Sequence, residues 1–241
     1  DGDGVVRIWN LATHNYIPIR AHEGPVLSLA FSPDSDLLAT GSTDGQSIRL
    51  WKVAHGEPVA RTFNGQVGDV WSLAFSAHGR NLASGSRDGP VRIWSLDDHS
   101  VGKIVAERLH ADEYGNFCFS PDGRLLAGLI DNDKPRVCIW DVNEGSLLPG
   151  LRYDRPRPSL SFSPDGKLLA TGHMNNTARL WEIPSGNIKA TLKGHVGIVQ
   201  GVAFSPDGKT LATGSYDGKV KLWNIATKQE LATLEPLPGS G

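Results

Sequence analysis

The sequence predicts an all-β fold, a β-propeller of four-stranded antiparallel blades with five complete blades and an N-terminal half blade. Three observations lead to this prediction. A strand–turn–strand pattern recurs along most of the 241 residues, tryptophans close the pattern at intervals typical of a propeller blade, and a second turn motif precedes each copy.

The recurring unit is clearest between Leu211 and Trp223, where the sequence reads LATGSYDGKVKLW. Leu211 and Thr213 lie two residues apart, as do Val220 and Leu222, which is the period of a strand with one buried face. The intervening Tyr-Asp-Gly favours a tight turn, so the segment is predicted to be a hairpin. Related hairpins are predicted at residues 38–51, 82–94, 126–140 and 169–181, and a trailing half at residues 3–9.

The closing tryptophans set the length of the repeat. Their intervals are 42, 43, 46, 41 and 42 residues, close to the roughly 40–45 residues of a propeller blade. Helical repeats of similar length would place apolar residues three and four positions apart, and the apolar residues of these repeats are not spaced in that way. A second motif, FSPDG or a close variant, precedes each hairpin and favours a type I turn between two strands. The tryptophans are Trp9, Trp51, Trp94, Trp140, Trp181 and Trp223, and the motif begins at Phe31, Phe75, Phe119, Phe162 and Phe204.

These motifs resemble those of the WD-repeat family of β-propellers, and the resemblance covers nearly all of the chain. Blades of that family carry a Gly-His pair before the first strand, an FSPDG-like turn, an SGSxD-like turn and a closing Trp-Asp. Of the six closing tryptophans, Trp140 alone is followed by aspartate, which is Asp141. The resemblance implies the propeller fold and, in regular blades, a hydrogen-bonded set of four side chains.

We call this set the tetrad: a histidine before strand one, a serine or threonine on strand two, the turn aspartate and the strand-three tryptophan. The complete tetrads implied by the resemblance are His22, Thr40, Asp44 and Trp51, and His195, Thr213, Asp217 and Trp223. The other three are incomplete: Gln66 replaces the histidine beside Ser84, Asp88 and Trp94, Tyr153 replaces it beside Thr171, Asn175 and Trp181, and His110 and Trp140 have Gly128 in place of the hydroxyl.

Histidine, hydroxyl and aspartate also make up a hydrolase triad. The structural interpretation is favoured because the constellation recurs in several blades, partly broken, whereas a nucleophile needs one site with its own oxyanion donors. The sequence contains no GxSxG, GxGxxG, GxxxxGK or HExxH motif, so we predict no enzymatic activity, no metal site and no cofactor. Asp131, Asn132 and Asp133 are interpreted as a solvated turn.

The composition fits many short strands and tight turns, with a net charge of −2, 28 glycines, 15 prolines and one methionine. The sequence has no apolar stretch of about 18 residues and no basic-then-apolar leader, which predicts neither a membrane span nor a signal peptide. Cys118 and Cys138 are expected on the first and third strands of one blade, beyond the roughly 7 Å that a disulfide spans. Free thiols favour a cytoplasmic protein.

We expect a single propeller domain. Its parts are a half blade at residues 1–21, blades at 22–65, 66–109, 110–152, 153–194 and 195–235, and a tail at 236–241. The half blade has the third and fourth strands alone, and residues 229–234 already supply the outer strand of the last blade. We therefore expect the sequence to come from a longer repeat array, and the strand at residues 5–10 to present an edge for self-association.

The expected function is that of a non-catalytic scaffold that binds a protein or peptide. In the family that the sequence resembles, partners dock on the loop face, which carries the loops into strand one and the turns between strands two and three. The candidate residues on this face are Trp71, Arg87, Asp69, Glu113, Asp131, Met174, Ile198, Gln200 and Tyr216. Trp71 stands outside the closing series, and tryptophan, tyrosine, methionine and arginine are enriched at interfaces. Packing of Trp71 against the channel wall is the alternative.

A competing interpretation is a propeller enzyme or small-ligand binder that uses the central channel. It would need polar or charged groups converging from several blades. Arg155 and Arg157 form a local basic spot, but the net charge of −2 argues against general nucleic-acid binding.

Overall fold

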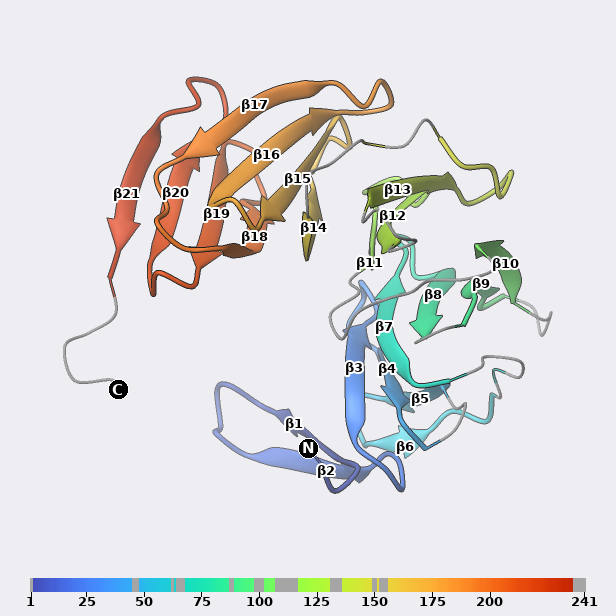
Figure 1. Cartoon of the computed structure of the whole chain (residues 1–241). Coiled ribbons are helices and arrows are strands. Elements are labelled where there is room, and N and C mark those ends of the chain that lie inside the picture. Colours follow the sequence, from blue (N-terminus) through green and yellow to red (C-terminus); the bar gives the residue numbers. More distant parts are fainter. Residues whose placement is uncertain are drawn as a thin grey trace.

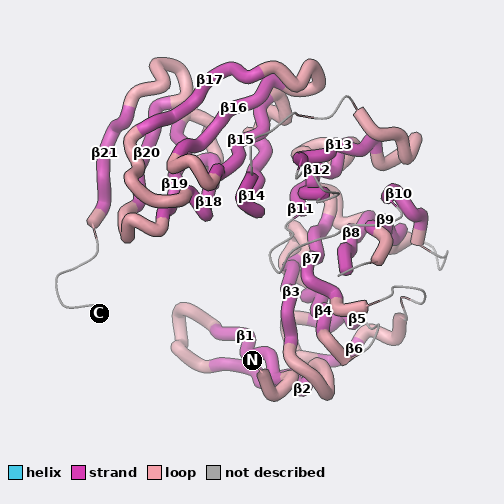
Figure 2. The backbone as a smooth tube through the Cα atoms, in the orientation of Figure 1, coloured by secondary structure: helices cyan, strands magenta, loops and turns pink. Residues whose placement is uncertain are grey.

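A computed structural model of the chain describes residues 2–44, 48–61, 63, 68–86, 89–97, 102–106, 117–130, 136–148, 151 and 156–235. Strands, turns and loops make up these residues (Figure 2). Among these residues there is no apolar helix with the length needed to span a membrane.

The strands form six antiparallel sheets. The first pairs β1 (Val5–Trp9) with β2 (Tyr16–Arg20). The second contains β3 (Val26–Phe31), β4 (Leu37–Ser42), β5 (Ile48–Lys52) and β6 (Glu57–Pro58), and the third β7 (Val70–Phe75), β8 (Asn81–Ser86), β9 (Val91–Ser95) and β10 (Lys103–Ala106). The fourth contains β11 (Phe117–Phe119), β12 (Leu125–Ile130) and β13 (Arg136–Asp141). The fifth contains β14 (Pro156–Phe162), β15 (Leu168–His173), β16 (Thr177–Glu182) and β17 (Ile188–Lys193), and the sixth β18 (Val199–Phe204), β19 (Thr210–Ser215), β20 (Val220–Asn224) and β21 (Glu230–Leu234).

The all-β propeller fold predicted from the repeat is confirmed. Within each sheet, consecutive strands are neighbours, as expected for propeller blades. Figure 1 shows the six sheets following one another around an arc, with β18–β21 lying apart from β1 and β2. The fourth sheet differs from the expected four strands, because its outer side is represented by two isolated bridges, Val137 with Leu151 and Trp140 with Leu147.

The core lies between neighbouring sheets. One hydrophobic cluster joins Leu50 of β5 to Leu73 of β7 and Trp94 of β9, and another joins Leu180 of β16 to Trp223 of β20. At each of these junctions the closing tryptophan of one sheet packs on aliphatic side chains of the sheet before it. This packing explains why a tryptophan recurs in the second to sixth sheets, since each of these fills the space between two blades.

The FSPDG turns close in the predicted way. In all five, the serine carbonyl accepts from the amide three residues on. In the four that contain aspartate, the serine hydroxyl also donates to the aspartate two residues on, at 2.5 to 2.6 Å. Because the serine hydroxyl and backbone amides donate to these carboxylates, the aspartate pKa values are lowered. The pairs are Ser32 with Asp34, Ser120 with Asp122, Ser163 with Asp165, and Ser205 with Asp207.

Cys118 and Cys138 are not joined in a disulfide, as predicted, and lie on β11 and β13 of the same sheet. β12 separates them, since Cys118 pairs with Ala127 and Cys138 with Gly128. Burial of the Cys118 thiol raises its pKa to about 12. A thiol with so high a pKa is protonated at neutral pH and therefore a weak nucleophile.

Candidate functional site

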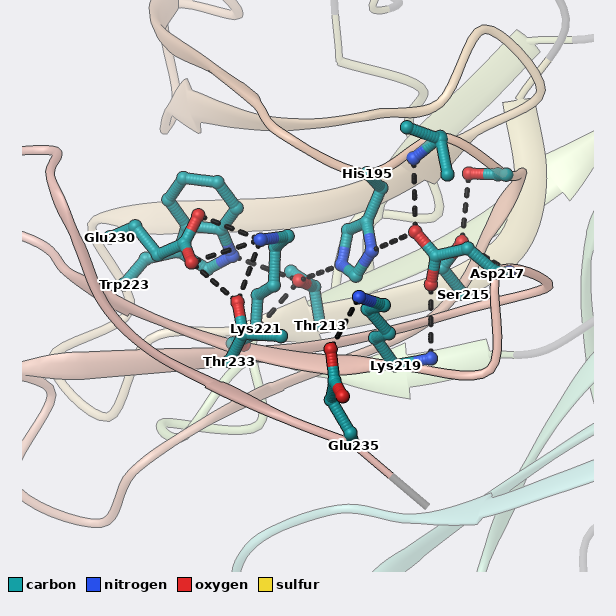
Figure 3. A network of polar contacts seen from close by, with 12 residues as sticks. His195, Thr213, Ser215, Asp217, Lys219, Lys221, Trp223, Glu230, Thr233 and Glu235 are labelled. Atoms are coloured by element: carbon teal, nitrogen blue, oxygen red, sulfur yellow. Dashed lines mark hydrogen bonds and ion pairs between the residues drawn. The ribbon is translucent and has the colours of Figure 1, made fainter. Parts of the chain in front are cut away.

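The tetrad of the last sheet joins its loop, its strands and its turn (Figure 3). His195 Nδ1 lies 2.8 Å from Asp217 Oδ2, and His195 Nε2 lies 2.8 Å from Thr213 Oγ1. Trp223 Nε1 donates to the same hydroxyl oxygen at 2.8 Å. A neutral imidazole satisfies this chain, with Nδ1–H donating to the carboxylate and Nε2 accepting from the hydroxyl. The structure therefore brings all four predicted side chains into one hydrogen-bonded row.

Asp217 holds the two surface segments of this blade together. Its carboxylate accepts from the backbone N–H groups of Val196, at 2.9 Å, and Lys219, at 3.0 Å. Burial alone would raise the pKa of Asp217, but these amides and His195 outweigh burial, and the pKa lies well below its usual range. The carboxylate is thus ionised at neutral pH and fixes the loop before β18 to the turn after β19.

The tetrad of the second sheet has the same geometry. His22 Nδ1 lies 3.0 Å from Asp44 Oδ2, His22 Nε2 lies 2.7 Å from Thr40 Oγ1, and Trp51 Nε1 donates to Thr40 at 3.0 Å. Burial lowers the pKa of His22, against the opposing effect of Asp44. The imidazole of His22 is therefore neutral at pH 7.

These hydroxyls are poorly placed for nucleophilic attack. Thr40 is fully buried and Thr213 is 1% exposed. Each hydroxyl oxygen already contacts an imidazole nitrogen and an indole N–H. A triad nucleophile must instead face a substrate beside oxyanion donors, so the arrangement fits a structural network.

The third and fourth sheets show two ways in which a tetrad is modified. In the third, Trp94 Nε1 donates to Ser84 Oγ at 2.8 Å, while Gln66 and Asp88 lie outside the described residues. In the fourth, a Cβ on Gly128 would lie 2.4 Å from the ring of Phe117. Phe117 therefore occupies the space in which the other blades hold a hydroxyl, which explains the glycine.

The fifth sheet contains a histidine that the sequence comparison missed. Trp181 Nε1 donates to Thr171 Oγ1 at 2.9 Å, and His173 Nε2 lies 3.0 Å from that same oxygen. His173 is fully buried and sits two residues from Thr171 on β15, so both side chains face the same side of the sheet. An imidazole is thus supplied by strand two, while Tyr153 lies outside the described residues and Asn175 accepts from Thr177. The signal in the sequence was a histidine at a position where three of the other hairpins have serine, at Ser42, Ser86 and Ser215.

A buried cation accompanies the last tetrad in Figure 3. Lys221 is 9% exposed, and its Nζ lies 2.8 Å from Glu230 Oε2 and 2.7 Å from Thr233 Oγ1. The hydrogen bond from Lys221 is the largest cause that lowers the pKa of Glu230. This ion pair ties the outer strand β21 to β20.

The buried neutral His22 predicts a measurable loss of stability in weak acid. Its folded-state pKa lies below the unfolded value of 6.5, so the unfolded chain binds the proton more readily, and stability falls as the pH drops through that value. We expect the free energy of unfolding in urea to fall less steeply between pH 7 and pH 5 in His22→Gln than in the wild type. The exposed His14 provides the control, since His14→Gln should keep the wild-type slope. Equal slopes for wild type and His22→Gln would contradict the assignment.

On the loop face, the residues next to the tetrad of the last sheet form an apolar and aromatic surface. Tyr216 is 62% exposed and Val196 is 82% exposed. Tyr216 N donates to Ile198 O at 2.9 Å, and Gln200 Nε2 donates to the Tyr216 hydroxyl oxygen at 2.6 Å. We call Val196, Ile198, Gln200 and Tyr216 the sixth-blade patch. Val196 was absent from the sequence-based candidates. Those were the residues three and five positions after each histidine or its equivalent, and the residue before each turn aspartate, whereas Val196 follows His195 directly.

The remaining candidates are more scattered. Met174 is 38% exposed at the corresponding turn of the fifth sheet, and Asp69 is partly exposed before β7. Trp71 is half-buried, and its Nε1 is buried without a hydrogen-bond partner among the residues that the structure describes. Trp71 thus combines a packed ring with a donor that is unused within these residues. Arg87, Glu113 and Asp131 lie outside the described residues.

Comparisons with known proteins give one consistent result. A family model described as "IFT122 first beta-propeller" matches residues 42–238, and one described as "WD domain, G-beta repeat" matches residues 14–52. The chain is similar to Periodic tryptophan protein 2 of Arabidopsis thaliana, with 30% identity over 183 residues, covering 75% of this chain and 20% of that protein. It is also similar to Apoptotic protease-activating factor 1 of Rattus norvegicus, with 27% identity over 204 residues, covering 78% and 15%. Transducin beta-like protein 3 of Bos taurus is 30% identical over 183 residues, covering 68% and 22%. The chain therefore spans about a fifth of the length of these relatives or less.

Proposed function

Since the chain belongs to the WD-repeat family of β-propellers, we propose that it is a non-catalytic interaction module that binds a protein or peptide on its loop face. The observation that carries the proposal is the sixth-blade patch. The exposed Val196 lies in the loop before β18 and the exposed Tyr216 in the turn after β19, and hydrogen bonds of Asp217 and of the Tyr216 backbone join these two segments.

The tetrad makes this surface suitable for binding because it limits the conformational entropy that the surface loses when a partner binds. Val196 and Tyr216 each neighbour a residue of the tetrad in the sequence, and Asp217 bonds the backbone of Val196. A surface that is already ordered loses little freedom on association. Tyr216 accepts a hydrogen bond from Gln200, which leaves its hydroxyl hydrogen available to an acceptor on the partner.

We propose that the partner presents an apolar side chain beside a backbone carbonyl or carboxylate. The apolar group would cover Val196 and the ring of Tyr216, and the acceptor would take the phenolic hydrogen. Met174 would extend the contact onto the fifth blade, because a flexible thioether adapts to different shapes. The absence of a disulfide between Cys118 and Cys138 supports a reducing, cytosolic setting for this interaction.

The proposal can be tested with peptides selected from a random displayed library against the 241-residue chain. We expect Tyr216→Ala, Trp71→Ala and Arg87→Ala each to weaken the affinity for the selected peptides by about 30-fold. This corresponds to a loss of about 2 kcal/mol in binding free energy, as is typical of a hot-spot residue. Isothermal titration calorimetry on folded variants gives the affinities.

Thr191→Ala and Lys228→Ala are the matched controls, since both residues are exposed. Thr191 lies on the outer strand β17, and Lys228 lies just before the outer strand β21. These controls should bind with wild-type affinity. Binding energy concentrated on the outer strands would rule out the loop face, and a melting shift produced by a small molecule in place of peptides would favour the channel-binding alternative.

A further inference from the structure

A lysine lies beside the sixth-blade patch and is bound by the same aspartate that holds the loop. Lys219 lies in the turn between β19 and β20, and its backbone N–H donates to Asp217 Oδ1 at 3.0 Å. The backbone N–H of Val196 donates to Asp217 Oδ2 at 2.9 Å. Because one carboxylate accepts from both amides, Lys219 and Val196 lie close together on the loop face.

The ammonium group of Lys219 binds a carboxylate of the same chain. Lys219 Nζ lies 2.6 Å from Glu235 Oε1, and Figure 3 shows this pair beside the tetrad. The hydrogen bond from Lys219 lowers the pKa of Glu235, so this carboxylate is ionised at neutral pH. The two side chains are 39% and 65% exposed. An exposed ion pair contributes little to stability, so another carboxylate can replace Glu235 at small cost.

A second lysine lies at the same end of the blades. Lys193 ends β17 and pairs with Thr177, the first residue after the turn on the loop face of the fifth sheet. Lys193 is exposed, and no ion pair between described residues includes it. The side chain of Asp217 is 4% exposed and binds His195 and backbone amides, so its charge is directed inward. Two lysines therefore border the apolar patch.

The second sheet shows that this combination belongs to the sixth blade. The residue after the tetrad histidine is Glu23 in the second sheet and Val196 in the sixth. The backbone N–H of Glu23 donates to Asp44 Oδ2 at 3.3 Å, so the two loops are held in the same way. Glu23 is exposed. Loops held alike thus present an acidic side chain in one blade and an apolar one in the other, and an acidic ligand would be repelled by the former.

We infer that the ligand of the loop face is an acidic peptide segment, in which an aspartate or glutamate replaces Glu235 on Lys219 while a neighbouring apolar side chain covers Val196. This inference rests on the proposed function and specifies its ligand. Charge complementarity favours it, because lysines border the patch and a carboxylate occupies one of them. The apolar contact supplies most of the affinity, and the ion pair selects acidic over neutral sequences.

The test uses a peptide selected from the displayed library against the 241-residue chain. Selected peptides should contain an acidic residue close to an apolar one. One of them is synthesised with its acidic residue and again with the corresponding amide, and both are titrated by calorimetry. Lys219→Gln should weaken binding of the acidic peptide about three- to fivefold, the effect of one exposed ion pair, and leave the amide peptide unchanged. Glu235→Gln should strengthen binding of the acidic peptide about twofold, because it removes the internal competitor.

Lys228→Gln is the matched control, since it removes an exposed lysine in the turn before β21, away from the loop face. It should bind both peptides as the wild type does. Peptides that lose affinity in Tyr216→Ala but contain no acidic residue, or bind equally well to Lys219→Gln, would overturn the acidic ligand and leave the proposed function intact. Binding that survives both Tyr216→Ala and Lys219→Gln would overturn both.

Discussion

Trp223→Ala should lower the free energy of unfolding by about 3–5 kcal/mol, as expected for truncation of a buried tryptophan. The side chain is 4% exposed and packs between the fifth and sixth sheets against Leu180 and Leu192. Its loss would also remove the indole N–H that donates to Thr213, leaving the tetrad hydroxyl with one donor fewer. Urea unfolding followed by circular dichroism measures the change.

Trp71→Ala is the control for Trp223→Ala, because it truncates a tryptophan that is less buried. Trp71 is half-buried, and its Nε1 donates to no described residue, so truncation should cost much less, about 1–2 kcal/mol. Equal losses for the two variants would show that Trp71 is part of the core rather than of a surface available to a partner.

Gly41→Ala should destabilise the chain by about 1–3 kcal/mol, since added atoms in a packed junction force neighbours to move. A Cβ at Gly41 would lie 2.5 Å from Val70 Cγ1 and 2.8 Å from Val70 Cβ, across the junction of the second and third sheets. Val70 is fully buried on β7, so the added Cβ would have to displace a packed side chain. Thermal melts monitored by circular dichroism give the change.

Gly214 occupies the equivalent place on β19 and makes a matched control. No atom lies within 4 Å of a Cβ built there. Gly214→Ala should therefore be neutral or stabilising by about 0.5–1 kcal/mol, because glycine in a strand loses more backbone entropy than alanine. Similar losses at Gly41 and Gly214 would mean that the junction does not determine the requirement for glycine.

Much of the fold could be predicted because each blade repeats a local pattern. The two-residue period around Leu211 and Val220 gives the strands β19 and β20, and the spacing of the closing tryptophans gives the blade length. The residues of both complete tetrads could be named from the resemblance to the WD-repeat family, whose motifs give His195 and Asp217 fixed places relative to Trp223.

Features that depend on contacts between strands could not be predicted in this way. Phe117 fills the space above Gly128 through cross-strand pairing, which a motif search does not see. His173 replaces a loop histidine from within a strand. Val196 donates its backbone N–H to Asp217 while its side chain is exposed. All three depend on which residues lie close together in space, whereas the motif records only their order along the chain.

The most direct test of the loop-face account is hydrogen–deuterium exchange of the 241-residue chain with and without a selected peptide. The account predicts slowed exchange at residues 195–200 and 215–218, where Asp217 joins the loop to the turn, with a smaller effect at residues 173–176. Exchange slowed in the outer strands β2, β17 and β21 while residues 195–200 and 215–218 remain unchanged would contradict it.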